Sequence, residues 1–462
     1  MQAGSPPGVT EPQSTERLAL ARRLWGRVLL FCLVPGLLSV DLINGAVNPP
    51  SRSGGAPTAA AQVSPGTVVR GLLTLMAVVL VLRVRAPGLR GMKQGFLSLA
   101  ALGVLGPVFG YLHGGSLHDL LADLMDLSKI LYALGMIVVF TLLYRRTRLP
   151  LEDVLAAIAL TGAFAGLSIV VTRVLGIGLA TYMWQNTGFK GLFISQNELG
   201  LTMGISLFAA VQALIATGRL RYLVAGLMTV PGMLLLGTRA AALGAFVAPT
   251  AVLAINARRF VSKRGRLGTV ALSLLLCIGL LVGGLWEYYI VRQERFQEEK
   301  FEQLVSRDVL LVRGILLVGA VQYLAQRSLA PDVIGEGSVR YQRGVARTLG
   351  LTMPGKAAEV DWLDLLGAYG PFFAVVVYAY YGSFLRRSRI LGPVYGKPVR
   401  LTALMMLGWL VAHSLVAGHA LGPMPAGTLA PLLAYIWFLA GGAKELIRAG
   451  DAEALALRIK AT

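Results

Sequence analysis

The sequence predicts an all-α fold: a polytopic membrane bundle of about twelve transmembrane helices, with a helical outer loop between the ninth and tenth helices. Two observations predict it. The 462 residues are 55% hydrophobic and only 14% charged, with a mean hydropathy of +0.67, whereas soluble domains are about 25% charged. Apolar runs also recur along the chain, many near the roughly 20 residues that a helix needs to cross a bilayer core. An ordinary soluble protein is therefore excluded.

Each predicted span is an apolar run bounded by charged or turn-forming residues. Residues 1–16 are polar and contain Pro and Ser, so we expect a disordered N-terminus there, a membrane domain over 17–448 and a tail over 449–462. The first run precedes the small-residue stretch "APTAAAQV", but it is longer than a signal peptide core and is expected to remain as a helix. The runs are 24–44, 66–82, 95–113, 127–144, 152–172, 192–216, 221–237, 240–256, 267–290, 365–385, 401–418 and 427–443.

The positive charges predict the orientation of these spans. When the segments between runs are assigned alternately inside and outside, 27 of the 43 Lys and Arg residues fall inside. Cytoplasmic loops carry such an excess, so both termini are expected in the cytoplasm. The net charge of +20 is then a matter of topology and does not indicate nucleic acid. The short outside segments hold six: Arg52, Arg70, Lys129, Arg173, Lys190 and Arg239.

The long loop over 291–358 holds the remaining basic residues and is not counted, because long loops do not set orientation. Its stretch 306–328 carries apolar residues at helical spacing, which predicts a helix lying on the membrane surface. A thirteenth span there would invert the following segments and put Arg386–Arg389 outside, so that alternative is rejected. The two cysteines, Cys32 and Cys277, lie in apolar runs and predict neither a disulfide framework nor a zinc site.

Three groups near the outer ends of the spans are candidates for a binding site. Arg239 starts the eighth run, where free N–H groups and the helix dipole favour phosphate; alternatively, it only snorkels to the interface. Lys190 precedes the sixth run and either contributes to the site or only anchors the end of the helix. Asn197 and Glu198 lie inside that run, and either line a cavity or bond to a neighbouring helix.

The outer loop supplies further candidates. Arg307 and Arg313 are cations near the start of its predicted helix. Gly335 and Gly337 in "IGEGSVR" form a flexible turn that either approaches a ligand closely or is only a turn. Histidines and acids near 113–126 fit a solvated helix face, so no metal site is predicted.

Three acids stand where the loop enters the tenth span, in "AAEVDWLDLLGAYG". Glu359, Asp361 and Asp364 fall in or next to the first turns of a helix, where the dipole favours the ionised form. An ionised carboxylate can act as a general base. Asp361 and Asp364 are three residues apart and share a helix face. The alternative is that all three only stabilise the helix dipole.

These motifs resemble a known family when they are taken in order. "KGLFISQNELG", "LLLGTRAAALGAF", "SRDVLL" with "DVIGEGSVR", and "EVDWLDLLGAYGPF" are similar to the O-antigen ligase and Wzy-type polysaccharide polymerase superfamily, over roughly 150–440. Its members are GT-C-like membrane glycosyltransferases with a large periplasmic loop. The resemblance implies the bacterial inner membrane, an active site facing the periplasm, and a donor glycan on undecaprenyl diphosphate.

The resemblance also implies roles for individual residues. Arg239 matches the family's Ser/Thr-Arg motif, Lys190 falls near a family arginine, and Arg307, with Arg313 as the fallback, matches the loop-helix arginine. These cations hold the diphosphate, and Glu359 takes the proton of the acceptor hydroxyl. Asp361 or Asp364 orients a sugar hydroxyl or an arginine. Neither a cofactor nor a metal is expected, since balanced charge makes diphosphate a good leaving group.

One departure from the family pattern separates two activities. Ligases of the family carry a His-Asn pair eleven residues before a helix glycine. In this sequence that glycine is Gly370, and Glu359 stands eleven residues before it in place of the pair. The pattern Glu-x-Asp-x-x-Asp favours polymerisation of lipid-linked repeat units into O-antigen, capsule or exopolysaccharide. The implied partners are a flippase and a chain-length regulator of the same pathway. The alternatives are a ligase that acts on lipid A core or another acceptor, and a transporter of an anionic solute.

Overall fold

The computed structural model describes residues 12–47, 65–84, 89–182, 187–260, 308–351, 360–416 and 418–448. Its helices in the first half are α1 (Pro12–Leu33), α2 (Pro35–Val47), α3 (Pro65–Arg83), α4 (Arg90–Leu112), α5 (Leu117–Thr147), α6 (Leu151–Val174), α7 (Gln196–Thr217), α8 (Leu220–Leu236) and α9 (Arg239–Phe260). The second half contains α12 (Asp308–Gln326), α13 (Leu329–Ile334), α14 (Ser338–Thr348), α15 (Asp361–Arg387), a 3-10 turn (Ser388–Ile390), α16 (Leu391–Tyr395), α17 (Lys397–Val416) and α18 (Pro423–Arg448).

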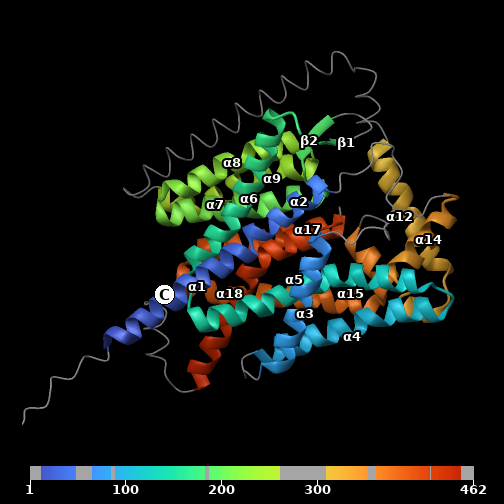
Figure 1. Ribbon diagram of the computed structural model, residues 1–462, viewed down its shortest axis with the longest axis horizontal. Helices are drawn as coiled ribbons and strands as arrows, with labels where there is room; N and C mark the ends of the chain where they lie inside the picture. Colours follow the sequence, from blue (N-terminus) through green and yellow to red (C-terminus); the bar gives the residue numbers. More distant parts are fainter. Residues whose placement is uncertain are drawn as a thin grey trace, which may run out of the picture.

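The described helices form a polytopic membrane bundle. They contain nine segments long and apolar enough to cross a membrane, with α1–α2 and α15–α16 each counted as one segment, and α3 and α8 coincide with two further predicted runs. The predicted ninth run, 267–290, lies outside the described residues, so the total of twelve stays a prediction. Figure 1 shows the long helices lying roughly side by side, with α5 and α18 in the middle of the view.

The first predicted span is divided into two helices. Pro35 has no N–H to continue the hydrogen-bond ladder of α1, and its fixed φ suits the first position of a new helix. Accordingly α1 ends at Leu33 and α2 begins at Pro35. Helix α1 itself begins at Pro12, so it extends into the segment 1–16 that the sequence predicts to be disordered.

Within the described residues, a short β-hairpin is the one addition to the predicted all-helical fold. Strands β1 (Leu179–Tyr182) and β2 (Thr187–Gly191) pair antiparallel between α6 and α7. Gly188 and Gly191 have positive φ, which glycine adopts without steric cost. The hairpin packs on the C-terminal end of α8, where Thr181 Oγ1 donates to the Leu236 carbonyl at 2.6 Å.

Small residues bring the central helices together. Gly162 and Gly166 are four residues apart on α6, a spacing that lets two membrane helices approach closely. A Cβ added at Gly166 would lie 2.1 Å from the Met228 carbonyl oxygen of α8. A Cβ at Gly232 would lie 2.3 Å from the Gly166 Cα. The α6–α8 contact therefore requires glycine on both helices.

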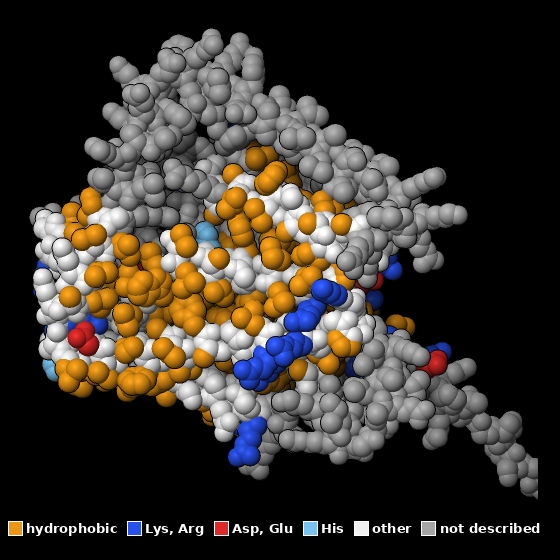
Figure 2. All heavy atoms as spheres, turned by 180° about the vertical axis from the view of Figure 1, so that it is seen from behind, with side chains coloured by type: hydrophobic (Ala, Val, Ile, Leu, Met, Phe, Trp, Pro, Cys, Tyr) orange, Lys and Arg blue, Asp and Glu red, His pale blue; other side chains and the backbone are white. Residues whose placement is uncertain are grey.

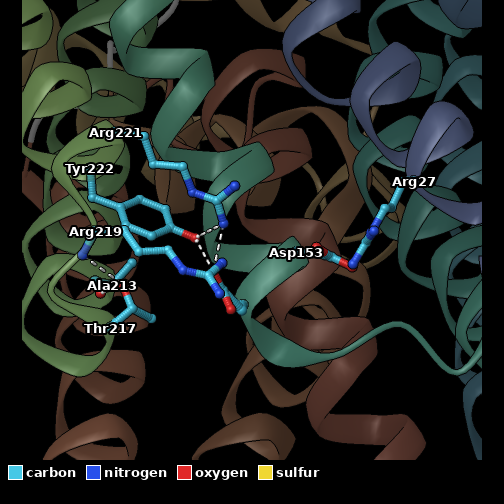
Figure 3. Close-up of polar contacts among 8 residues, drawn as sticks. Arg27, Asp153, Ala213, Thr217, Arg219, Arg221 and Tyr222 are labelled. Carbon is cyan, nitrogen blue, oxygen red and sulfur yellow. Dashed lines mark hydrogen bonds and ion pairs between the residues drawn. The ribbon is translucent and has the colours of Figure 1, made fainter. Parts of the chain in front are cut away.

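The segments assigned to the inside in the sequence meet at one end of the bundle, which we name the inner end. Figure 3 shows Arg219 and Arg221, at the start of α8, extending toward the start of α6. Both pair with Glu152 there, and Arg27 of α1 pairs with Asp153 at 2.8 Å. The opposite end, named the outer end, carries the connections assigned to the outside. These contacts agree with the predicted alternation for α1, α6 and α8, while the topology as a whole and its sidedness stay predictions.

The outer loop forms helices, as its apolar periodicity predicts. Helix α12 spans Asp308–Gln326, close to the predicted 306–328, and packs on α14 through Gly319 and Leu349. Helix α14 is tied to the start of α5, where Arg343 makes two hydrogen bonds to Asp119, at 2.9 and 2.7 Å. The described part of the loop is thus docked on the bundle.

The surface matches a protein surrounded by lipid. Figure 2 shows one face with hydrophobic side chains across most of its width, and with acidic side chains visible only toward its left and right margins. Large apolar side chains such as Leu24, Leu72, Leu112 and Phe372 are exposed. Such an extent of apolar surface marks a membrane interaction in a folded protein.

Candidate functional site

Four helix ends converge at the outer end of the bundle: the starts of α7, α9, α15 and α18. A Cβ at Gly200 of α7 would lie 2.9 Å from Thr238 Oγ1, next to the start of α9. A Cβ at Gly422, just before α18, would lie 2.7 Å from the Glu198 carboxyl group of α7. Asp361, the first residue of α15, contacts the connection into α18. This convergence, the outer cluster, brings predicted site residues from separate parts of the chain to one place.

Arg239 is the first residue of α9 and belongs to the outer cluster. Thr238 caps this helix, since its Oγ1 accepts from the Ala241 N–H at 3.2 Å. The structure describes the backbone of Arg239 but not its side chain. The free N–H groups in the first turn of α9 and the positive end of its dipole favour an anion at this helix start.

Lys190 is buried beside the start of α7, with only 6% of its surface exposed. Its Nζ donates to the Ile194 carbonyl at 3.0 Å and to Gln196 Oε1 at 3.4 Å. A buried ammonium group needs such partners, because desolvation disfavours its charge. Asn197 follows in the first turn of α7 and is half-buried.

Asp361 binds the connection between α17 and α18. Its Oδ1 accepts from the His419 N–H at 2.6 Å, and its Oδ2 accepts from the N–H groups of Ala420 and Leu421 at 2.9 and 3.1 Å. His419 has a φ of +60°, a conformation that is uncommon for a residue other than glycine. The carboxylate therefore holds a loop in shape at the edge of the outer cluster.

Asp364 lies one turn further along α15 and is half-buried. It is near enough to Tyr341 of α14 and Tyr369 of α15 to interact electrostatically with both. Burial of Tyr341 raises the pKa of its phenol, so this hydroxyl stays neutral. The acids predicted at the start of α15 thus differ: Asp361 binds a backbone loop, and Asp364 is near enough to two phenols to interact electrostatically with them.

Gly335 and Gly337 contact protein rather than open space. Both have positive φ. A Cβ at Gly335 would lie 2.4 Å from the Ala368 carbonyl oxygen, and a Cβ at Gly337 would lie 2.0 Å from Asp123 Oδ2. The Gly337 N–H also donates to the Ala368 carbonyl at 2.9 Å. The described contacts therefore give these glycines a packing function between α14, α5 and α15.

The glycine turn is flanked by a buried ion pair. Arg327 Nη1 donates to Glu336 Oε1 at 3.2 Å and to the Gly367 carbonyl at 3.0 Å, and each charged side chain is 3% exposed. Burial, with Glu336 close by, raises the pKa of Tyr323 to about 12. These contacts fix the outer loop to α15 just beyond the predicted acids.

The remaining predicted residues are not described in full. Glu359, the predicted base, and Arg307 lie outside the described residues. Arg313 belongs to α12, but its side chain is likewise not described. Among the residues that the structure does describe, no group of three or more His, Cys, Asp or Glu side chains is arranged to hold a metal ion. Metal-independent chemistry therefore stays a prediction.

The sequence interpretation missed a buried charged group next to the outer cluster. Arg70 of α3 pairs through Nη2 with both carboxylate oxygens of Asp41 in α2, and these side chains are 17% and 7% exposed. Tyr132 of α5 lies near this pair, and Glu198 interacts electrostatically with both of its members. The sequence feature that indicates this pair is a charge inside each of the first two apolar runs. Such charges are costly within a membrane and usually functional.

Comparison with known proteins identifies the family. A family model described as O-antigen ligase like membrane protein matches residues 59–293, half of the chain. The chain belongs to the O-antigen ligase-like membrane protein family. The matched residues of the family take in Lys190, Asn197 and Arg239, and end before the acids at the start of α15. No curated protein matches the chain.

Proposed function

We propose that this member of the O-antigen ligase-like family polymerises undecaprenyl-diphosphate-linked saccharide repeat units at the periplasmic face of the bacterial inner membrane. The observation that carries the proposal is the outer cluster, where the start of α9 with Arg239 meets α7, α15 and α18. A cationic helix start suits a diphosphate, and adjacent carboxylates suit hydroxyl groups. The product is then O-antigen, capsule or exopolysaccharide.

The proposed reaction is a single group transfer. The acceptor hydroxyl oxygen attacks the anomeric carbon of the donor sugar, the bond from that carbon to the diphosphate oxygen breaks, and undecaprenyl diphosphate leaves. Glu359 takes the hydroxyl proton as general base. Arg239, Arg307 and Lys190, with Arg313 as the fallback for Arg307, neutralise the departing diphosphate. No metal ion enters this scheme.

Substitution of Glu359 tests the assignment of the base. Glu359→Gln removes the proton acceptor while nearly preserving size, so polymer should disappear although the protein still folds. Thermal unfolding of the purified variant provides the folding control. Polymer of normal length from Glu359→Gln would exclude this residue as the base.

Membership of the O-antigen ligase-like family favours a second candidate, a ligase that moves finished glycan onto lipid A core or another acceptor. Purified protein supplied with lipid-linked repeat units separates the two activities. A ladder of products indicates a polymerase, while a single transfer to an added acceptor indicates a ligase. A polymerase should also act beside a flippase and a chain-length regulator, which co-purification can detect.

A further inference from the structure

Glu198 lies among charged groups from several helices at the outer end. It is in the first turn of α7, half-buried, and its Oε2 accepts a long hydrogen bond of 3.4 Å from the Met424 N–H of α18. It is also near enough to Arg70, Asp41 and Lys129 to interact electrostatically with each. These residues come from α3, α2 and α5, so four transmembrane elements and the start of α18 surround one carboxyl group.

The other charges of this group are already paired. Arg70 binds both oxygens of Asp41, and Lys129 Nζ donates to Asp126 at 2.7 Å. Glu198 has no cation within salt-bridge distance among the described residues, and its Oε1 accepts no hydrogen bond from them. A carboxylate offers about four lone-pair positions, so most of the acceptor capacity of Glu198 is unused.

We infer that Glu198 binds the acceptor saccharide by accepting hydrogen bonds from its hydroxyl groups. This inference rests on the proposed function and adds to it the residue that receives the acceptor. Glu198 is a positioning residue here: it orients the acceptor while the proton goes to another group.

The chemistry of the surroundings favours hydroxyl groups over a phosphate as the ligand. A carboxylate has the same sign of charge as a diphosphate and repels it, so the diphosphate is assigned to Arg239 and Lys190 and the hydroxyl groups to Glu198. An ionised carboxylate instead attracts neutral donors, and hydrogen bonds to a charged group are stronger than neutral ones. The cations close by are paired with Asp41 and Asp126, so they leave the lone pairs of Glu198 unoccupied.

Stabilisation of the α7 dipole accounts for an acid in the first turn of that helix but not for the rest of this arrangement. A dipole effect requires only the start of α7. It does not require a half-buried carboxylate facing the start of α18, with two buried or paired cations beside it. Binding of a ligand explains why the group stays accessible and why other helices place charges around it.

The test compares Glu198→Gln with Glu152→Gln in the full-length protein. Glu152 is also a half-buried glutamate at a helix start, but it lies at the inner end. Repeat units are prepared from a strain that lacks this protein and are released from lipid, so that they accept but cannot donate. The concentration of this soluble acceptor is varied while the lipid-linked donor is kept constant, and binding of the acceptor alone is measured calorimetrically.

For Glu198→Gln we expect the acceptor concentration that gives half-maximal transfer to rise about tenfold or more, since a hydrogen bond to a charged group is lost. The calorimetric dissociation constant should rise equally, half-saturation by the donor should change less than about twofold, and Glu152→Gln should match the native protein. If Glu198→Gln does not fold, Glu198→Asp keeps the charge on a shorter side chain and should give a smaller rise.

The outcomes separate this inference from the proposed function. Native transfer together with unchanged acceptor binding in Glu198→Gln would overturn the inference alone. Acceptor binding that depends on Glu198 without any native transfer would retain the inference as a saccharide site and overturn the polymerase and ligase proposals. Neither binding nor transfer by the native protein would overturn both.

Discussion

The two ends of the bundle use the same pair of residue types in different ways. At the outer end, Arg70 and Asp41 form an ion pair whose side chains are 17% and 7% exposed. At the inner end, Arg27 and Asp153 form an ion pair in which the arginine side chain is 49% exposed. Both carboxylates are buried, since the Asp153 side chain is only 11% exposed, so the two pairs differ in how far the arginine is enclosed. Burial of the arginine, rather than the number of charges, therefore distinguishes the two pairs.

This difference supports the proposal that the outer end carries the chemistry. The inner arginine side chains are about half exposed, so they bind nearby carboxylates at little cost in desolvation. A buried ion pair contributes weakly to stability, because removing both charges from water offsets their attraction. The outer pair is therefore better explained by the site that it borders than by a contribution to stability.

The largest expected effect comes from breaking the outer ion pair. Arg70→Met leaves Asp41 buried without its partner, which costs about 3–5 kcal/mol in a protein interior. Arg27→Met removes an arginine that is half-exposed, so the cost should be smaller than for Arg70→Met, although Asp153 is only 11% exposed. Thermal unfolding in the same detergent measures both changes. Equal losses at the two ends would show that the comparison of burial is wrong.

A smaller effect is expected at the glycine turn of the outer loop. Gly337→Ala would place a methyl group 2.0 Å from Asp123 Oδ2, and the glycine has a φ of +83°. Gly350→Ala is the matched control, because Gly350 has a φ of +67° but no atom within 4 Å of its added Cβ.

We expect Gly350→Ala to cost about 1 kcal/mol from backbone strain, and Gly337→Ala to cost about 3 kcal/mol from strain plus the clash. Limited proteolysis of the outer loop reports detachment of α14 from α5. If both variants are cleaved at the same rate, α14 does not depend on this contact.

The sequence predicts the helices better than it predicts the site, for a physical reason. Apolar runs and basic flanks are local signals, so the bundle and the helix at 308–326 follow from them. The pairing of Arg70 with Asp41 joins two runs, and the contact of Asp361 with the connection before α18 joins residues far apart in the chain. Such contacts depend on packing, which a single sequence does not reveal. The sequence predicts a turn at Gly335 and Gly337, but it does not indicate that Ala368 and Asp123 fill the space beside them.

A still smaller effect is expected for the loop that Asp361 holds. Asp361→Asn keeps one oxygen acceptor, which can retain the N–H groups of Ala420 and Leu421, while the contact with His419 N–H is lost. The expected cost is about 2 kcal/mol, since one hydrogen bond to a charged group disappears. Amide hydrogen exchange over 418–422 should become faster. Unchanged exchange together with reduced transfer would instead indicate direct contact of Asp361 with substrate.

The smallest expected effect is at the inner end. Glu152 accepts from Arg219, Arg221 and Tyr222, so Glu152→Gln weakens three contacts at once. The arginine side chains are more than half exposed, so solvent screens these pairs and the expected cost is below about 1 kcal/mol. Transfer activity should be unchanged, and raising the salt concentration should reduce the difference in unfolding temperature between variant and native protein, because salt screens exposed charges. A loss of transfer in Glu152→Gln with normal stability would mean that the inner end also contributes to function, and the contrast between the two ends would then fail.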